Sequence, residues 1–273
     1  MSKWHGGRRL IGRTFVVYYG HGPLAGLEEF DLAVLEPKGW STPALRALQA
    51  HSVTTLAYVS VLEVPPWLQS ALMLTREDLV AINSEPWVKE PYGNVVARPE
   101  SQTWRRYLSQ QLETLYRGGW DGLFLDTLGD VEDEALAEQR GALVPGTADL
   151  VRLVRAHFPD RPIVVNNGMW RVVPLIVNYI DGVCWEGPLT PEVLGQPWAQ
   201  ALLEFLGRLA QERGWTNLML TQIAGTSLKA TQNLLRFGDD ADRYGFLAYA
   251  APGNYVDRIR LPDGRIVGPQ PSA

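Results

Sequence analysis

The chain alternates between short apolar runs and longer segments with a helical pattern. Eight apolar runs occur, at residues 14–20, 31–37, 53–63, 120–126, 161–168, 181–187, 217–225 and 244–252. They are continuous rather than alternating in polarity, which is typical of parallel strands buried on both faces. Because strands and helical segments alternate about eight times over this length, the pattern predicts an α/β protein made of one (β/α)8 barrel.

Start and stop signals place helices between the apolar runs. A Thr-Pro pair or a capping hydroxyl next to a helical pattern marks a helix start, and a glycine marks its end. We expect helices to begin near Thr42, Ser101, Thr147, Thr190 and either Thr226 or Ser227. The helix from Thr190 is expected to be long and to end near Gly214.

No linker, low-complexity segment or charge block divides the chain, so residues 1–273 are predicted to form a single domain. Two parts stand out from the barrel pattern. Residues 64–100 form a long loop rich in Pro and Trp, and loops of that length in a compact domain are usually functional. The tail from Leu261 is expected to be loosely ordered.

Polar side chains stand where the predicted strands end. They are Tyr19, Glu36, Glu63, Asp126, Asn166, Asn167, Glu186, Gln222 and Tyr249. The carboxyl ends of barrel strands form the active-site face, so these side chains are expected to line one cleft.

Side-chain alternation brings two of these acids together. Asp126 shares a strand face with Gly122 and Phe124, Glu186 shares one with Gly182 and Cys184, and Tyr249 shares one with Gly245 and Leu247. If these faces point inward, the two acids converge over the barrel axis from strands four and six. Two carboxylates across a small cleft are what glycoside hydrolysis requires, and their spacing distinguishes retention from inversion.

Each candidate acid has a structural alternative. Asp126 could cap the helix that follows it, whereas Glu186 precedes Gly187-Pro188, a poor helix start. Glu36 and Glu63 could bind substrate or form structural ion pairs. Outside the cleft, Asp121 and Asp181 precede strand-start glycines and suit turns. Residues 130–134 form an acidic run typical of a solvated loop, from which Asp130 could reach the cleft rim.

Composition excludes several other classes of protein. The net charge of −5 without a basic run argues against a nucleic-acid partner. The single cysteine, Cys184, excludes an internal disulfide and suits a buried core position. The four histidines lack metal-ligand spacing, and neither a G-x-S-x-G elbow nor a phosphate-loop pattern occurs, so no metal or cofactor is expected. No run is long enough to span a membrane, and no signal peptide is visible after the basic start.

Ten Trp and ten Tyr residues are unusual for this length. Several tryptophans lie near predicted loops: Trp40, Trp67, Trp87, Trp170, Trp185 and Trp198. Flat rings at a cleft stack on the apolar faces of sugars, although ordinary core packing explains most tryptophans. Trp185, next to Glu186, is included among the expected substrate-binding residues.

The order of these motifs resembles glycoside hydrolase family 114, the endo-α-1,4-polygalactosaminidases, which share a barrel with TM1410-like and spherulin-4-like proteins. The similar pieces are FDLAVLEP, LAYVSVLEV, the loop and helix start WVKEPYGNVVARPESQTWRRYL, GWDGLFLDTLGD, VVNNG and IDGVCWEG. Together they cover roughly residues 15–249.

The resemblance implies an acid pair at Asp126 and Glu186 that cleaves internal α-1,4 linkages in galactosamine- and N-acetylgalactosamine-containing exopolysaccharide, such as galactosaminogalactan or Pel-type polymers. Glu186 is favoured as the general acid/base and Asp126 as the nucleophile or electrostatic stabiliser. The family also implies an extracellular or cell-envelope location, and we expect a monomer. A barrel that binds polysaccharide without cleaving it, or a glycosidase for another sugar, are the alternatives.

Overall fold

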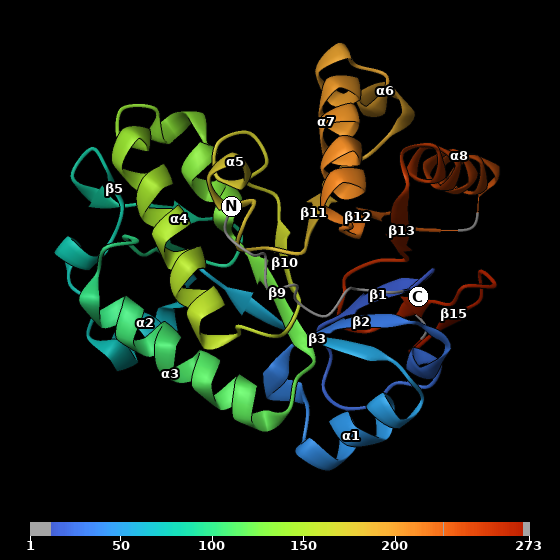
Figure 1. The fold of residues 1–273 in the computed structure, drawn as a ribbon, viewed down its shortest axis with the longest axis horizontal. Helices are drawn as coiled ribbons and strands as arrows, with labels where there is room; N and C mark the ends of the chain where they lie inside the picture. The colour runs from blue at the N-terminus through green and yellow to red at the C-terminus, as the bar shows by residue number, and fades with distance from the viewer. Residues whose placement is uncertain (1–11, 226, 270–273) are drawn as a thin grey trace.

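The computed structural model describes residues 12–225 and 227–269. Eight parallel strands form a nearly closed barrel with helices around the outside (Figure 1). In sheet order the strands are β1 (Phe15–Tyr18), β2 (Leu32–Leu35), β3 (Thr54–Ser60), β9 (Gly122–Asp126), β10 (Ile163–Asn166), β11 (Gly182–Glu186), β12 (Asn217–Gln222) and β13 (Phe246–Ala251). Each lies within one predicted apolar run, which confirms the (β/α)8 barrel.

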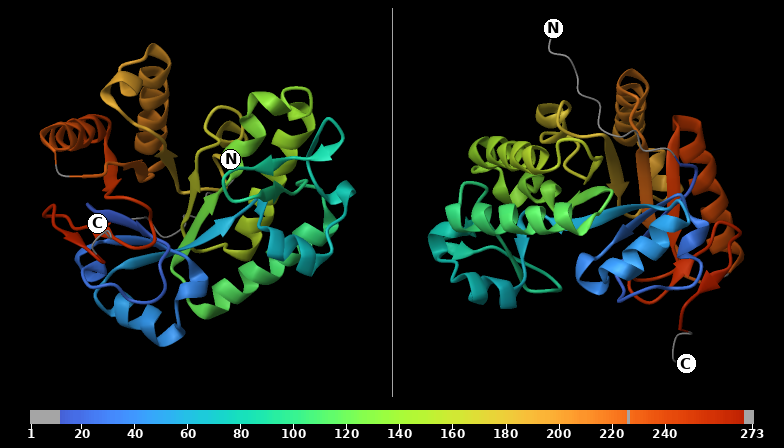
Figure 2. Two further views of the ribbon diagram at one scale, coloured as in Figure 1. Left: turned by 180° about the vertical axis from the view of Figure 1, so that it is seen from behind. Right: turned by 60° about the horizontal axis from the view of Figure 1, so that its bottom comes forward.

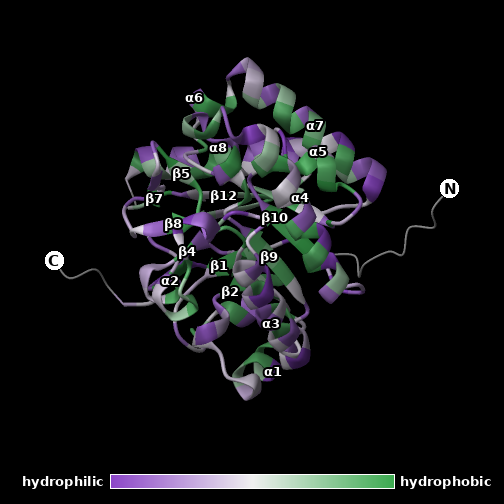
Figure 3. Ribbon diagram, turned by 90° about the vertical axis from the view of Figure 1, so that its left-hand side faces the viewer, coloured by the Kyte–Doolittle hydropathy of each residue, from purple (hydrophilic) through white to green (hydrophobic). Residues whose placement is uncertain are grey.

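Burial explains why these runs form strands. The residues of β1, β2 and β10 are buried without exception, and the coloured ribbon shows the strands as hydrophobic elements inside a mixed outer layer (Figure 3). A strand covered on both faces gains from apolar side chains at every position. Polar residues such as Asp126 and Glu186 stand at the carboxyl ends of these strands.

Helices form the outer layer. They are α1 (Thr42–Ala50), α2 (Pro66–Leu72), α3 (Gln102–Gly118), α4 (Arg140–His157), α5 (Val173–Ile176), α6 (Pro191–Leu194), α7 (Pro197–Arg213) and α8 (Leu228–Tyr244). Short 3₁₀ helices occur at Leu27–Glu29, Pro37–Gly39, Arg76–Asp78, Leu128–Glu132 and Glu134–Leu136. In the part of the chain described, no helix is both long and apolar enough to cross a membrane.

The helix starts agree with the predictions in part. Ser101 and Ser227 accept N–H groups from the first turns of α3 and α8, whereas Thr226 lies outside the described residues. The first helix is capped by Ser41, so Thr42 is its first residue rather than its cap.

Two predicted helix starts are wrong. Thr147 is not a cap but lies inside α4, where its hydroxyl donates to the Leu143 carbonyl at 2.8 Å. The long helix expected from Thr190 to Gly214 is two helices: Thr190 caps only α6. The helix is interrupted at Gly195-Gln196, and α7 begins at Pro197. Proline is tolerated there because N–H groups in the first turn have no partner within the helix.

Between β1 and β2 the described chain has only a 3₁₀ helix, and the C-terminal segment lies near this connection. Strands β14 (Ile259–Arg260) and β15 (Ile266–Val267) form a hairpin beside β1 and β13. The side chain of Leu261 is buried against Gly26. The tail from Leu261, expected to be loosely ordered, is therefore packed on the barrel as far as it is described.

The long loop at residues 64–100 has structure of its own. It contains α2 and an antiparallel sheet of β4 (Glu63–Val64), β8 (Asn94–Val96) and β7 (Val88–Lys89), beside a small hairpin of β5 (Ala81–Ile82) and β6 (Glu85–Pro86). Both views of Figure 2 show this insertion next to α3, outside the barrel strands.

The two Asp-Gly pairs at strand starts tie neighbouring strands together. The Asp121 carboxylate accepts the N–H of Thr55 at 3.0 Å, and that of Asp181 accepts the N–H of Ile163 at 2.9 Å. Asp181 also forms an ion pair with Arg155 of α4. These aspartates, expected to serve in turns, thus also fix the register of adjacent strands.

Candidate active site

Asp126 and Glu186 end strands β9 and β11, and the strand between them links the two side chains. The Nδ2 atom of Asn166, the last residue of β10, lies 2.9 Å from Asp126 Oδ1 and 2.6 Å from Glu186 Oε2. Since both bonds leave the same nitrogen, the two carboxylate oxygens are separated by at most the sum of these distances, about 5.5 Å. The convergence that side-chain alternation predicted is present.

Each carboxylate also receives a hydrogen bond from a tyrosine that sequence analysis did not select. The Tyr58 hydroxyl of β3 donates to Asp126 Oδ2 at 3.0 Å, and the Tyr255 hydroxyl donates to Glu186 Oε1 at 2.6 Å. Tyr58 shares the strand face of Ser60, so alternation could have identified it. Tyr255 follows β13 in an irregular segment, where no periodic signal exists.

Burial raises the pKa of both acids. For Asp126, desolvation outweighs the hydrogen bonds from the Thr127 N–H, Asn166 and Tyr58, which favour the ionised form. For Glu186, desolvation is the main cause, and the Asp126 charge raises its pKa further against the opposing effect of Tyr255. Two carboxyls with raised pKa values at one cleft are typical of an acid/base site.

Tyr19 completes an aromatic group around the acid pair. Its ring centroid lies 4.7 Å from that of Tyr58 and 5.6 Å from that of Tyr255. Burial and the nearby Asp126 charge raise its pKa well above the usual range, so Tyr19 stays neutral. It is one of the predicted cleft residues that the structure places beside the acids.

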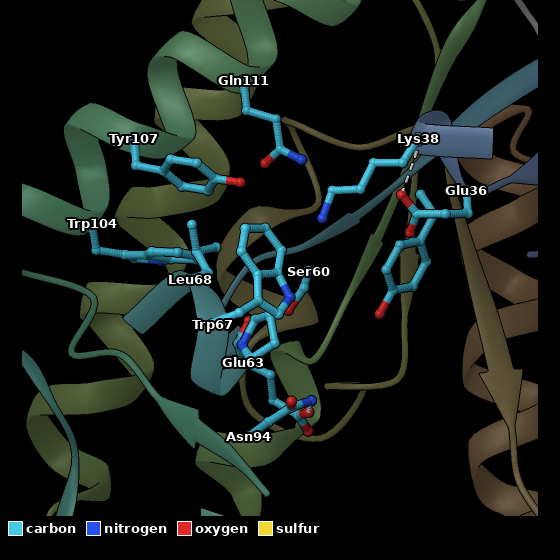
Figure 4. A pocket seen from close by; sticks show the side chains of 12 residues that line it. Glu36, Lys38, Ser60, Glu63, Trp67, Leu68, Asn94, Trp104, Tyr107 and Gln111 are labelled. Carbon is cyan, nitrogen blue, oxygen red and sulfur yellow. Dashed lines mark hydrogen bonds between the residues drawn. The ribbon is translucent and has the colours of Figure 1, made fainter. Parts of the chain in front are cut away.

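A pocket of about 170 Å³ opens on the side of β2 and β3 (Figure 4). Its lining includes two predicted residues, Glu36 and Glu63, together with Trp67 of α2. Figure 4 shows Tyr107 of α3 on one wall and Lys38 on the opposite wall, with the lysine pointing inward. The pocket therefore combines carboxylates with flat aromatic rings.

Neither pocket carboxylate forms an ion pair within the ranges that the structure describes. Glu36 accepts the N–H of Lys38 at 3.2 Å, and Glu63 accepts the Nδ2 of Asn94 at 2.7 Å. The Thr127 hydroxyl accepts the Glu63 N–H at 3.3 Å. Both acids are thus oriented by hydrogen bonds rather than by ion pairs.

Asp130 lies near Glu63 and Asp126 and is largely buried, rather than exposed in a solvated loop. Its carboxylate pairs with Lys89 of β7 at 2.9 Å, and only 11% of its side chain is exposed. Burial raises its pKa to about 7, with Lys89 opposing and Glu63 adding to the shift. The pair connects the insertion at residues 64–100 to the loop after β9.

A second pocket, of about 310 Å³, lies on the other side of the acid pair, at the ends of β11 and β12. Gln222 lines it, as predicted for a cleft residue, with Thr190 and Asn233. In strand order, the ends of β9 and β11, which carry Asp126 and Glu186, therefore have a pocket on each side.

The structure places three predicted cleft residues elsewhere. Asn167 accepts the Glu186 N–H through Oδ1 at 3.1 Å, which holds β11 in place. Trp185 alternates with Glu186 and is buried against Trp198. Tyr249 packs on Phe15 in the core with its hydroxyl accepting a backbone N–H.

The strand face proposed for Tyr249 needs one correction. Gly245 is not a strand residue; it ends α8 in the left-handed conformation, and β13 begins at Phe246. Leu247 and Tyr249 remain within the strand, but the segment after it, rather than Tyr249, supplies the aromatic group at the acids. Within the described ranges, no cluster of His, Cys, Asp and Glu has the arrangement of a metal site.

The geometry defines a (β/α)8 barrel with a hydrogen-bonded carboxylate pair at the carboxyl ends of its strands. No family model and no curated protein matches the sequence. Solved structures do match, and the likeness concerns the fold.

The glycoside hydrolase domain of PelA from Pseudomonas aeruginosa has a TM-score of 0.72 at 18% identity, over 90% of this chain and 96% of that one. Aspergillus fumigatus Ega3 in complex with galactosamine has a TM-score of 0.71 at 10% identity, over 91% and 95%. The α-galactosidase TtGalA from Thermus thermophilus has a TM-score of 0.58 at 12% identity, over 96% and 67%.

Proposed function

We propose that this protein is an endo-acting glycoside hydrolase that cleaves internal α-1,4 linkages in galactosamine- and N-acetylgalactosamine-containing polysaccharide. The observation that carries the proposal is the Asn166 bridge, which holds oxygens of Asp126 and Glu186 within about 5.5 Å of each other. Two buried carboxyls at that spacing, at the mouth of a barrel, suit glycosidic bond cleavage.

The spacing favours a retaining reaction, because carboxyl groups of inverting enzymes stand roughly 6.5–9.5 Å apart to admit a water. Glu186, whose pKa is raised by burial and by the Asp126 charge, is assigned to protonate the leaving oxygen. Asp126, which accepts three hydrogen bonds, is assigned to attack the anomeric carbon. In the second step Glu186 takes a proton from the water that releases the sugar.

The amino-sugar substrate is supported by the charge of the cleft. Glu36 and Glu63 line a pocket beside the acid pair against one lining cation, Lys38, so the net charge of the lining is negative and favours an ammonium group. The Lys38 ammonium lies 4.1 Å from the centroid of the Trp67 ring, whose other face is offered to a sugar ring. The barrels of similar fold include a protein crystallised with galactosamine. A pocket on each side of the acids suits cleavage within a chain. We also place the protein where such polymers occur, outside the cell or at its envelope, and as a monomer.

The test is the release of reducing ends from a partly deacetylated α-1,4-linked galactosamine/N-acetylgalactosamine polymer. Wild type is expected to release them, and Glu186→Gln is expected to lower the rate by at least about 100-fold. Glu192→Gln, which changes an exposed acid on α6, is the matched control and should leave the rate unchanged. Absence of release by folded wild type would point to a binding barrel or to another sugar.

A further inference from the structure

Two tryptophans on the active-site face of the barrel are half exposed and lie against each other. Trp170 is 53% exposed and Trp198 is 48% exposed. Their ring centroids are 6.2 Å apart, with the planes inclined by 56°. Large aromatic side chains usually bury most of their surface, and a cluster that does not do so marks a contact surface.

Trp198 packs against a buried tryptophan, Trp185. The ring of Trp185, which is only 5% exposed, lies 6.0 Å from it, centroid to centroid. Trp198 is also in the first turn of α7, directly after Pro197. Trp185 points away from the acid cleft because it alternates with Glu186 on β11. Its ring instead packs against Trp198.

Trp170 is fixed through its backbone. The Glu132 carboxylate accepts the N–H groups of Trp170 at 3.3 Å, Arg171 at 2.7 Å and Val172 at 3.0 Å. This arrangement holds the loop in one conformation, so a ligand that binds the ring need not order it first. Preorganisation of this kind lowers the entropic cost of binding.

The pair belongs to the same face as the acids. β10 ends at Asn166 and leads within four residues to Trp170, and β11 ends at Glu186 and leads through α6 to Trp198. Figure 1 shows α5, α6 and α7 gathered at the upper edge of the barrel. Loops after the carboxyl ends of barrel strands surround the active site. The pocket of Glu36 and Glu63, in contrast, lies on the side of β2 and β3.

We propose that Trp170 and Trp198 form a remote stacking platform for a pyranose ring of the polysaccharide chain, outside the subsites next to the scissile bond. The identity of the ligand rests on the proposed function. A galactosamine unit offers an apolar C–H face and an ammonium group, and both are attracted to the face of an indole ring. The platform would hold long chains and contribute nothing to short ones.

The experiment compares a long partly deacetylated galactosamine polymer with a short chromogenic galactosamine oligosaccharide as substrates. Trp170→Ala/Trp198→Ala is expected to raise KM for the polymer roughly tenfold with kcat unchanged, and to leave the short substrate unaffected. Trp170→Phe/Trp198→Phe keeps flat rings and should retain most of the affinity. Leu235→Ala, which removes exposed apolar surface on α8, is the control.

An unchanged KM in the double alanine variant, or an equal loss on both substrates, would overturn the platform. If wild type cleaves neither substrate, the proposed function fails, and the platform is judged separately by native electrophoresis in gels that contain the polymer. Retardation of wild type that the double variant loses supports the platform, and equal retardation of the two proteins refutes it.

Discussion

The Tyr255 hydroxyl donates a 2.6 Å hydrogen bond to Glu186 Oε1 and so joins the segment after β13 to the end of β11. This bond stabilises the carboxylate form and opposes the rise in the Glu186 pKa that burial causes. In return, burial and the Glu186 charge raise the pKa of the tyrosine far above its usual range. Tyr255 therefore remains a donor at every pH at which the protein works.

Tyr255→Phe is expected to raise the pKa of Glu186, because the carboxylate loses a donor. If Glu186 is the general acid, the basic limb of the pH profile of kcat/KM moves to higher pH. The rate at the optimum should fall roughly 10- to 100-fold. Tyr116→Phe, which removes a hydroxyl that bonds Asp160 outside the cleft, is the control. A shift of the acidic limb instead would assign Glu186 as the nucleophile.

Asp130→Asn is expected to change how stability depends on pH. The folded chain raises the Asp130 pKa to about 7, from roughly 3.9 in the unfolded chain, and so favours the protonated carboxyl. The contribution of Asp130 to the free energy of unfolding therefore falls as pH rises from about 4 to 7. The neutral amide of Asp130→Asn does not titrate and so does not lose stability in this way. The Tm of the variant minus the Tm of wild type should therefore increase between about pH 4 and 7 and stay constant at higher pH.

Thermal unfolding at several pH values measures this difference. Asp149→Asn, which alters an exposed carboxylate on α4, serves as the comparison. Parallel Tm curves for wild type and Asp130→Asn would show that burial of Asp130 does not favour its protonated form.

Gly122→Ala tests the packing below the acid pair. A Cβ at this position would stand 2.6 Å from Leu56 Cδ2 and would also meet the Pro162 carbonyl oxygen. Overpacking of this kind should lower the free energy of unfolding by about 1–3 kcal/mol in denaturant titration. Gly238→Ala adds the same methyl in α8, where nothing lies within 4 Å, and should raise stability by about 0.5–1 kcal/mol. Equal effects at the two sites would contradict this packing.

Binding of a cationic polymer should weaken as salt rises, since the pocket lining carries two carboxylates, Glu36 and Glu63, against one cation, Lys38. The Debye length falls from about 10 Å at 0.1 M to about 3 Å at 1 M. Affinity measured by native electrophoresis across this range should drop, and Glu63→Gln should flatten the dependence. An affinity that does not change with salt concentration would instead favour recognition through the aromatic rings and hydroxyl groups of the cleft alone.

The fold and the acid pair could be predicted because both follow from local patterns. Continuous apolar runs that end on polar residues define buried parallel strands, and alternation along β9 and β11 places Asp126 and Glu186 on inward faces. The resemblance to family 114 named the same acids. The interruption between α6 and α7 also has a local signal, because Gly195 suits a helix end and Pro197 suits the first turn of the next helix.

Other features could not be predicted because they depend on distant parts of the chain. Tyr255 reaches Glu186 across 69 residues from a segment without periodicity. Lys89 meets Asp130 only because the insertion folds back over the loop after β9. Tyr249 and Trp185 were assigned to the cleft by their positions near strand ends, whereas packing partners decide where such rings lie.

The late position of Tyr255 has a consequence for the protein during its synthesis. A ribosome that adds roughly 5–20 residues per second needs roughly 3–14 seconds to move from Glu186 to Tyr255. During that interval a nascent chain carries both carboxylates, but neither the hydroxyl at Glu186 nor the strand that completes the barrel. The hydrogen bond that orients the Glu186 carboxylate can therefore form only after β13 and the segment that follows it have been synthesised.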